Sequence, residues 1–98
     1  MHLDRRTVSR KTPRDGKLEI TPGAAARLVG LGAELRAEWD GARAPAAVVT
    51  MTCSCGGDAM QHEHHFLESV IFRTLPVGEV VDLALDSRVV RVAVTPST

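Results

Sequence analysis

Residues 18–28, LEITPGAAARL, decide the fold prediction because a short strand passes directly into a helix there. Residues 18–20 alternate apolar and polar side chains as a strand does. Thr21 is a favourable N-cap, and Pro22 suits the first helical position, where its missing N–H costs nothing. The next apolar residues recur at the spacing of one helical face: Ala24, Leu28, Leu31 and Leu35. We therefore expect an amphipathic helix that ends at Asp40-Gly41.

The residues downstream of this helix predict several strands. Residues 46–52, AAVVTMT, form a β-branched run that leads into Cys53. Residues 70–73 are predicted as another strand, although their apolar residues also fit a helical spacing. Residues 81–94 alternate on both sides of Asp86-Ser87, which is typical of a hairpin. This order predicts an α+β domain, with one amphipathic helix packed on a small, mostly antiparallel sheet.

The first 17 residues differ in composition from the rest of the chain. They carry six basic and two acidic side chains, are poor in apolar residues, and contain Pro13 and Gly16. Such a stretch buries too little apolar surface to offset the entropy of ordering. We expect residues 1–17 to be a flexible basic arm, either solvated or in contact with nucleic acid or an acidic partner. Residues 18–95 are then a single α+β domain.

Length and charge exclude several functional classes. Ninety-eight residues suit one domain, and twelve basic residues balance twelve acidic ones, so no overall field attracts nucleic acid or anionic lipid. The apolar runs are too short to span a membrane, and no apolar segment of a secretory signal follows Met1–Leu3. Cys53 and Cys55, one residue apart, cannot cross-link distant parts of a fold. We expect a cytoplasmic, thiol-bearing protein with no membrane and no nucleic-acid partner.

Thiols and imidazoles are concentrated in one part of the sequence. Residues 53–57 read CSCGG and residues 62–65 read HEHH, and these segments supply the candidate ligands Cys53, Cys55, His62, His64 and His65. Thiolate and imidazole are the usual ligands of zinc and of iron–sulfur clusters. His62 and His64 would share a face of a strand, whereas His62 and His65 would share a face of a helix. Either arrangement, with two thiolates, completes a four-ligand set.

Other chemistries fit these residues less well. Residue 66 is Phe, so HEHH is not the HExxH motif of zinc proteases. The sequence holds no phosphate-binding glycine loop and no serine at a nucleophile elbow, so we expect no enzyme. Two adjacent thiols near cationic imidazoles could instead act in metal-free thiol–disulfide chemistry. A polar surface loop with ordinary thiols and solvated histidines is the remaining interpretation.

The layout resembles the HesB-like family of A-type iron–sulfur carrier and scaffold proteins over residues 18–90. Residues 18–28 are similar to that family's strand-to-helix entry, I-x-x-T-x-x-A-A. Residues 52–56, TCSCG, are similar to its Gly-Cys-Ser-Gly turn, and Cys53 lies 33 residues after Ile20. Residues 70–72 and 80–86 are similar to its later strands. The resemblance implies a HesB-like fold with Cys53 at the position of the first cluster-binding cysteine.

The chain also departs from that family. Thr52 and Cys55 stand where the family has glycines, and the sequence has no C-terminal Cys-Gly-Cys, so it resembles a diverged member. We expect a carrier or scaffold that binds an iron–sulfur cluster or iron, with zinc as the alternative. Iron–sulfur assembly or recipient proteins would be its partners, and a homodimer could share a cluster. The alternative is a metal-free thiol-redox or protein-interaction module on the same scaffold.

Overall fold

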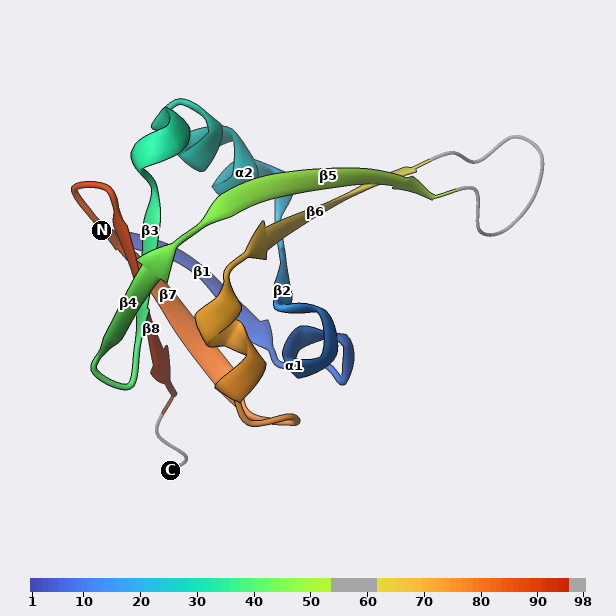
Figure 1. Ribbon diagram of the computed structural model, residues 1–98. Helices are drawn as coiled ribbons and strands as arrows, with labels where there is room; N and C mark the ends of the chain where they lie inside the picture. The colour runs from blue at the N-terminus through green and yellow to red at the C-terminus, as the bar shows by residue number, and fades with distance from the viewer. Residues whose placement is uncertain (54–61, 96–98) are drawn as a thin grey trace.

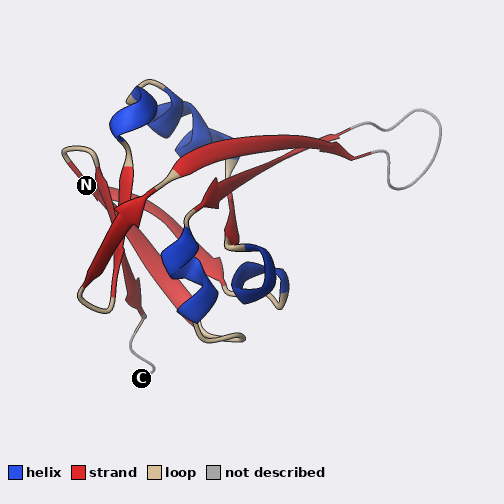
Figure 2. Cartoon of the chain, in the orientation of Figure 1, coloured by secondary structure: helices blue, strands red, loops and turns tan. Residues whose placement is uncertain are grey.

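A computed structural model describes residues 1–53 and 62–95, which form an α+β fold (Figures 1 and 2). The strands are β1 (His2–Thr7), β2 (Lys17–Ile20), β3 (Arg36–Trp39), β4 (Ala42–Pro45), β5 (Ala47–Cys53), β6 (His62–Glu68), β7 (Val80–Asp86) and β8 (Val89–Val94). The helices are α1 (Lys11–Asp15) and α2 (Pro22–Val29), and the 3₁₀ turns are η1 (Gly32–Glu34) and η2 (Val70–Thr74). The predicted α+β class is confirmed.

The strands form two sheets rather than the single sheet expected. One sheet has five strands in the order β1-β7-β8-β3-β4, and the other has three in the order β2-β6-β5. All pairs are antiparallel except β3 with β8. Figure 1 shows the far ends of β5 and β6 reaching away from the rest of the molecule. The three-stranded sheet therefore ends in a projecting two-stranded ribbon.

The core lies where the two sheets, α2 and η2 meet. Its largest fully buried side chain is Phe72 of η2, and Leu67, Leu83 and Val90 are also fully buried. Ala24, Ala25 and Leu28 form the buried face of α2. Because α2 contacts β5 and β6, it fixes the base of the projecting hairpin.

Helix α2 begins as predicted but ends earlier. The Thr21 hydroxyl accepts a hydrogen bond from the Ala24 N–H at 3.2 Å, with Pro22 in the first turn. The expectation of a helix to Asp40-Gly41 is wrong, because α2 ends at Val29 and the chain becomes strand β3. Asp40 and Gly41 have φ angles of 53° and 78° and join β3 to β4. An Asp-Gly pair with two positive φ angles is the favoured two-residue hairpin turn.

The expectation of a flexible basic arm is also wrong. Residues 2–7 form β1, which pairs with β7, and residues 11–15 form α1. Leu3, Val8 and Thr12 are buried and anchor the segment in the fold. The Asp4 carboxylate accepts hydrogen bonds from the Arg5 N–H at 2.8 Å and the Thr21 N–H at 2.9 Å. A few apolar anchors and one carboxylate therefore order this segment despite its charge.

The structure corrects one further local prediction and defines a segment that the sequence left open. Residues 70–74 form the 3₁₀ turn η2 instead of a strand, and this turn buries Phe72. Residues 62–68, whose structure the sequence left open, form strand β6. The hairpin predicted over residues 81–94 is confirmed as β7 and β8, with Ser87 at a φ of 58° in the turn. None of the helices in the described residues is long and apolar enough to cross a membrane.

We expect Asp82 of β7 to make the stability of the fold depend on acid pH. Its carboxylate accepts a hydrogen bond from Arg5 Nε at 2.7 Å and another from Thr95 Oγ1 at 2.8 Å. The Arg5 hydrogen bond, followed by that of Thr95, holds the pKa of Asp82 below its ordinary value. A lowered folded-state pKa stabilises the protein above the unfolded-state pKa of about 4, and this stabilisation is lost as pH falls through the folded-state value.

Asp82→Asn should therefore reduce the dependence of stability on acid pH. We expect the unfolding free energy of the variant to fall less steeply than that of the wild type between about pH 5 and pH 2. Urea unfolding at a series of pH values measures this slope. Glu79→Gln is the matched control, since the exposed Glu79 carboxylate forms no hydrogen bond or ion pair with a side chain in the described part of the chain. Parallel slopes for Asp82→Asn and the wild type would contradict the prediction.

Candidate functional site at the β5–β6 hairpin

The pairing register of β5 and β6 positions the predicted ligands. Cys53 pairs with His62, Met51 with His64, and Thr50 with His65. Strand β2 covers the other edge of β6 only as far as the pair of Ile20 with His65. Residues 62–64 therefore belong to the two-stranded part of the hairpin, beyond the three-stranded sheet.

His62 and His64 share one face of β6. They are alternate residues of a strand, so their side chains point to the same side. Their ring centroids are 5.7 Å apart and the ring planes are nearly perpendicular, at 78°. The strand geometry considered from the sequence is thus the one that brings two imidazoles together.

Glu19 of β2 orients the ring of His64. The distance from His64 Nδ1 to Glu19 Oε2 is 2.9 Å, across 45 residues of sequence. Because Nδ1 contacts the carboxylate, Nε2 is the nitrogen left for another ligand. Metal-binding histidines commonly have this carboxylate contact on their second nitrogen, where it fixes ring orientation and tautomer. Glu19 could not be found from the sequence, since only the register of β2 with β6 brings it near His64.

His65 lies on the opposite face from His62 and His64. Its Nδ1 is 3.0 Å from Thr50 Oγ1, and its Nε2 is 4.0 Å from Glu63 Oε2. Its side chain is only 17% exposed. The structure therefore does not bring His65 together with the other two histidines.

The structure describes only one of the two cysteines, and that one by its backbone. The backbone of Cys53 ends β5 opposite His62, whereas Cys55 falls outside the described residues. Within residues 1–53 and 62–95, no group of three or more His, Cys, Asp or Glu side chains is gathered to hold a metal ion. The described part of the candidate site is thus the imidazole pair with Glu19.

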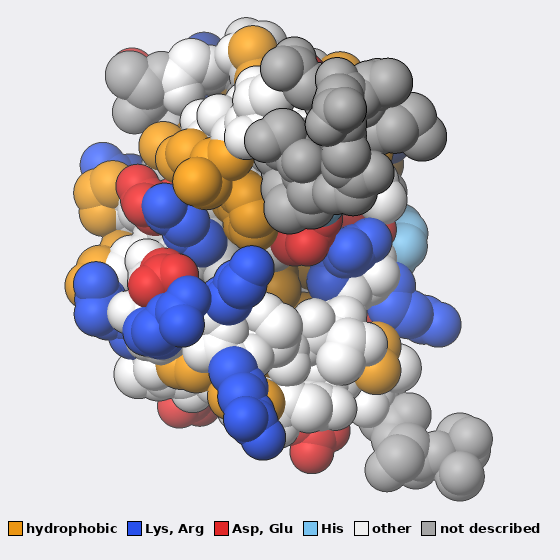
Figure 3. All heavy atoms as spheres, turned by 90° about the vertical axis from the view of Figure 1, so that its right-hand side faces the viewer, with side chains coloured by type: hydrophobic (Ala, Val, Ile, Leu, Met, Phe, Trp, Pro, Cys, Tyr) orange, Lys and Arg blue, Asp and Glu red, His pale blue; other side chains and the backbone are white. Residues whose placement is uncertain are grey.

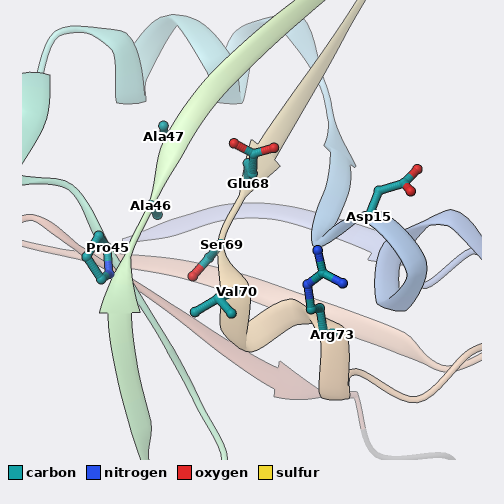
Figure 4. A pocket seen from close by; sticks show the side chains of 8 residues that line it. All are labelled: Asp15, Pro45, Ala46, Ala47, Glu68, Ser69, Val70 and Arg73. Atoms are coloured by element: carbon teal, nitrogen blue, oxygen red, sulfur yellow. The ribbon is translucent and has the colours of Figure 1, made fainter.

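A hollow at the base of the hairpin was not predicted (Figure 4). It has a volume of about 490 Å³ and is lined by Asp15, Pro45, Ala46, Ala47, Glu68, Ser69, Val70 and Arg73. Arg73 donates a hydrogen bond to the Arg14 carbonyl at 3.3 Å. Residues from three separate stretches of the chain meet here, so no local pattern in the sequence indicates the hollow.

Ser69 lines this hollow and carries a buried hydroxyl with no hydrogen-bond partner within the described part of the chain. A buried polar group without a partner lowers stability. We expect Ser69→Ala to raise the unfolding free energy by about 1 kcal/mol, measured by urea unfolding. Ser9→Ala, at an exposed serine, is the control and should change it by less than about 0.5 kcal/mol. A loss of stability in Ser69→Ala would show that the hydroxyl makes a stabilising bond.

Comparisons with known proteins give no relative for this chain. No family model, curated protein or solved structure matches it.

Proposed function

We propose that the β5–β6 hairpin binds zinc or iron, the iron either alone or in an iron–sulfur cluster, and that the protein is a metal carrier or scaffold. The observation that carries this proposal is the pair His62 and His64, with Glu19 fixing the second ring. An oriented imidazole beside a second imidazole is the arrangement expected of a metal-binding histidine pair.

The spacing of the two rings supports a shared ion. Two imidazoles that bind one tetrahedral ion through bonds of about 2.0–2.1 Å have ring centres roughly 5 Å apart. The observed distance between ring centroids is 5.7 Å. Rotation about the side-chain torsions of the exposed His62 can shorten the distance between the ring centroids by this amount. Exposed side chains change rotamer readily.

Two imidazoles leave room for further ligands. The thiolates of Cys53, whose position pairs with His62, and of Cys55 complete the set that we propose. Sulfur with imidazole suits zinc, and it also suits iron in clusters. A cross-strand metal would further stabilise the hairpin, since a two-stranded ribbon alone is marginal in water. We also propose that the protein is related to the HesB-like family and that iron–sulfur assembly or recipient proteins are its partners.

The position of the histidines favours transport over catalysis. His62 is exposed and His64 is half-buried, on a ribbon that projects from the fold (Figure 1). An ion held there is accessible to the ligands of a recipient protein. Exchange of ligands between donor and recipient is the chemistry that a carrier or scaffold requires.

Elemental analysis tests the proposal. We expect protein purified without chelator to contain close to half or one equivalent of zinc or iron per chain. Anaerobic incubation with iron and sulfide should give a coloured protein if the cargo is a cluster. A variant with Cys53→Ser and Cys55→Ser should lose most of the metal under either treatment. Metal-free wild-type protein that neither zinc nor iron with sulfide can load would contradict the proposal.

A further inference from the structure

The exposed edge of β5 differs from the other sheet edges. In the described residues, β1 and β4 are the edges of the five-stranded sheet, and β2 and β5 are those of the three-stranded sheet. Charged residues or proline occur in the first three: β1 has Asp4, Arg5 and Arg6, β4 has Arg43 and Pro45, and β2 has Lys17 and Glu19. The sequence of β5, AVVTMTC, has neither over seven residues.

This difference indicates that the free edge of β5 is suited to pairing with another strand. An uncharged edge strand presents unpaired N–H and C=O groups and acts as a template for another strand, whereas charges and proline prevent such pairing. Met51 of β5 is 48% exposed, and Ala47, Thr50 and Thr52 are exposed as well. No strand of the described residues covers this edge.

We propose that β5 pairs in antiparallel orientation with β5 of a second copy of this chain, about a two-fold axis at Thr50. Val49 then lies opposite the partner's Met51, and Val48 lies opposite the partner's Thr52. Thr50 lies opposite the partner's Thr50. Apolar residues thus meet apolar residues on one face of the ribbon, and β-branched residues meet on the other, both of which are favourable cross-strand pairs.

A second copy fits this edge for two further reasons. The pairing is the same on both chains and therefore closes as a symmetric dimer instead of an open chain of copies. The formal net charge of the chain is zero, so two copies do not repel each other at long range.

An apolar groove of about 420 Å³, which includes Leu28, Val29 and Val48, lies along the start of the same edge. On the face shown in Figure 3, acidic side chains lie among the basic ones, and apolar side chains gather above them.

The dimer has a consequence for the proposed metal site, and this consequence alone depends on the proposed function. In the antiparallel register, position 53 lies opposite the partner's Ala47. The two Cys53 positions are then six residues apart along the ribbon, or about 20 Å. Each chain would therefore bind its own metal, and a cluster shared between these two tips is excluded.

Sedimentation equilibrium in the presence of chelator tests the dimer independently of metal. We expect the wild-type mass to rise from one chain to two as protein concentration increases. Val49→Lys with Met51→Lys places two lysine pairs face to face and should weaken dimerisation by roughly thirtyfold or more. Val49→Lys with Met51→Glu changes the same two positions but pairs opposite charges across the axis, so this variant should still dimerise.

The two double variants control for each other. Circular dichroism and thermal unfolding establish that both are folded before their masses are compared. A wild-type protein that is monomeric at every concentration overturns the proposal. A dimer that survives Val49→Lys with Met51→Lys also overturns it, since another surface would then be responsible. Two monomeric variants beside a dimeric wild type would contradict the register about Thr50.

Discussion

Replacing Phe72 with alanine is expected to lower the unfolding free energy by about 3–5 kcal/mol. Phe72 is fully buried, and it is the largest such side chain in the core. The chain has only two phenylalanines, one tryptophan and no tyrosine, so the rest of the core is built from smaller aliphatic residues. These residues are held by two sheets and cannot move far enough to fill the cavity. A small domain has a total stability of about 5–15 kcal/mol, so the variant should be close to unfolding.

Urea unfolding measures this loss, and Phe66 offers a matched control. Phe66 lies on β6 opposite Glu19 and is only half-buried. Phe66→Ala removes the same atoms from a site where water can replace them, so it should cost clearly less than Phe72→Ala. Equal losses in the two variants would contradict the position of Phe72 at the centre of the core.

Replacing both His62 and His64 with alanine is expected to abolish metal binding. The pair supplies the only two imidazoles that share a face in the described part of the hairpin. A competition titration with a chromophoric chelator measures the affinity of each variant. Glu19→Gln keeps both ligands but weakens the contact that orients His64. Loss of such a partner typically reduces metal affinity by about 10–100-fold.

His65→Ala is the matched control for this series. It removes an imidazole from the same strand, but from the opposite face, where the ring contacts Thr50. We expect its metal affinity to equal that of the wild type. If His65→Ala lowered the affinity as much as His62→Ala with His64→Ala, the two-histidine site would be wrong.

Local signals in the sequence predicted the elements that depend on neighbouring residues. The alternation around Asp86-Ser87 predicted the β7–β8 hairpin, and Thr21-Pro22 predicted the start of α2. Asp40-Gly41 forms the turn between β3 and β4, although the apolar spacing before it predicted a helix that ends there. That spacing placed Leu35 in the predicted helix, although Leu35 has an extended backbone and is buried between η1 and β3. Two periodic patterns can share one short apolar stretch, and only tertiary packing decides between them.

The features that the sequence did not reveal all depend on long-range register. The contact between Glu19 and His64 exists because β2 pairs with β6. The pairing of β1 with β7, which orders the basic N-terminal segment, joins opposite ends of the chain. The five ligands predicted from spacing are divided in the same way, since β6 places His65 on the other face from His62 and His64. Residue type indicated the metal chemistry that we propose, and strand pairing determines which residues could take part in it.

X-ray absorption spectroscopy of the zinc-loaded protein tests the metal site most directly. We expect a four-coordinate ion with two nitrogen ligands at about 2.0–2.1 Å and sulfur ligands at about 2.3 Å. The nitrogen contribution should disappear in the variant with His62→Ala and His64→Ala and persist in His65→Ala. A spectrum with oxygen ligands alone, or one that is identical in all three proteins, would show that these imidazoles do not bind the metal.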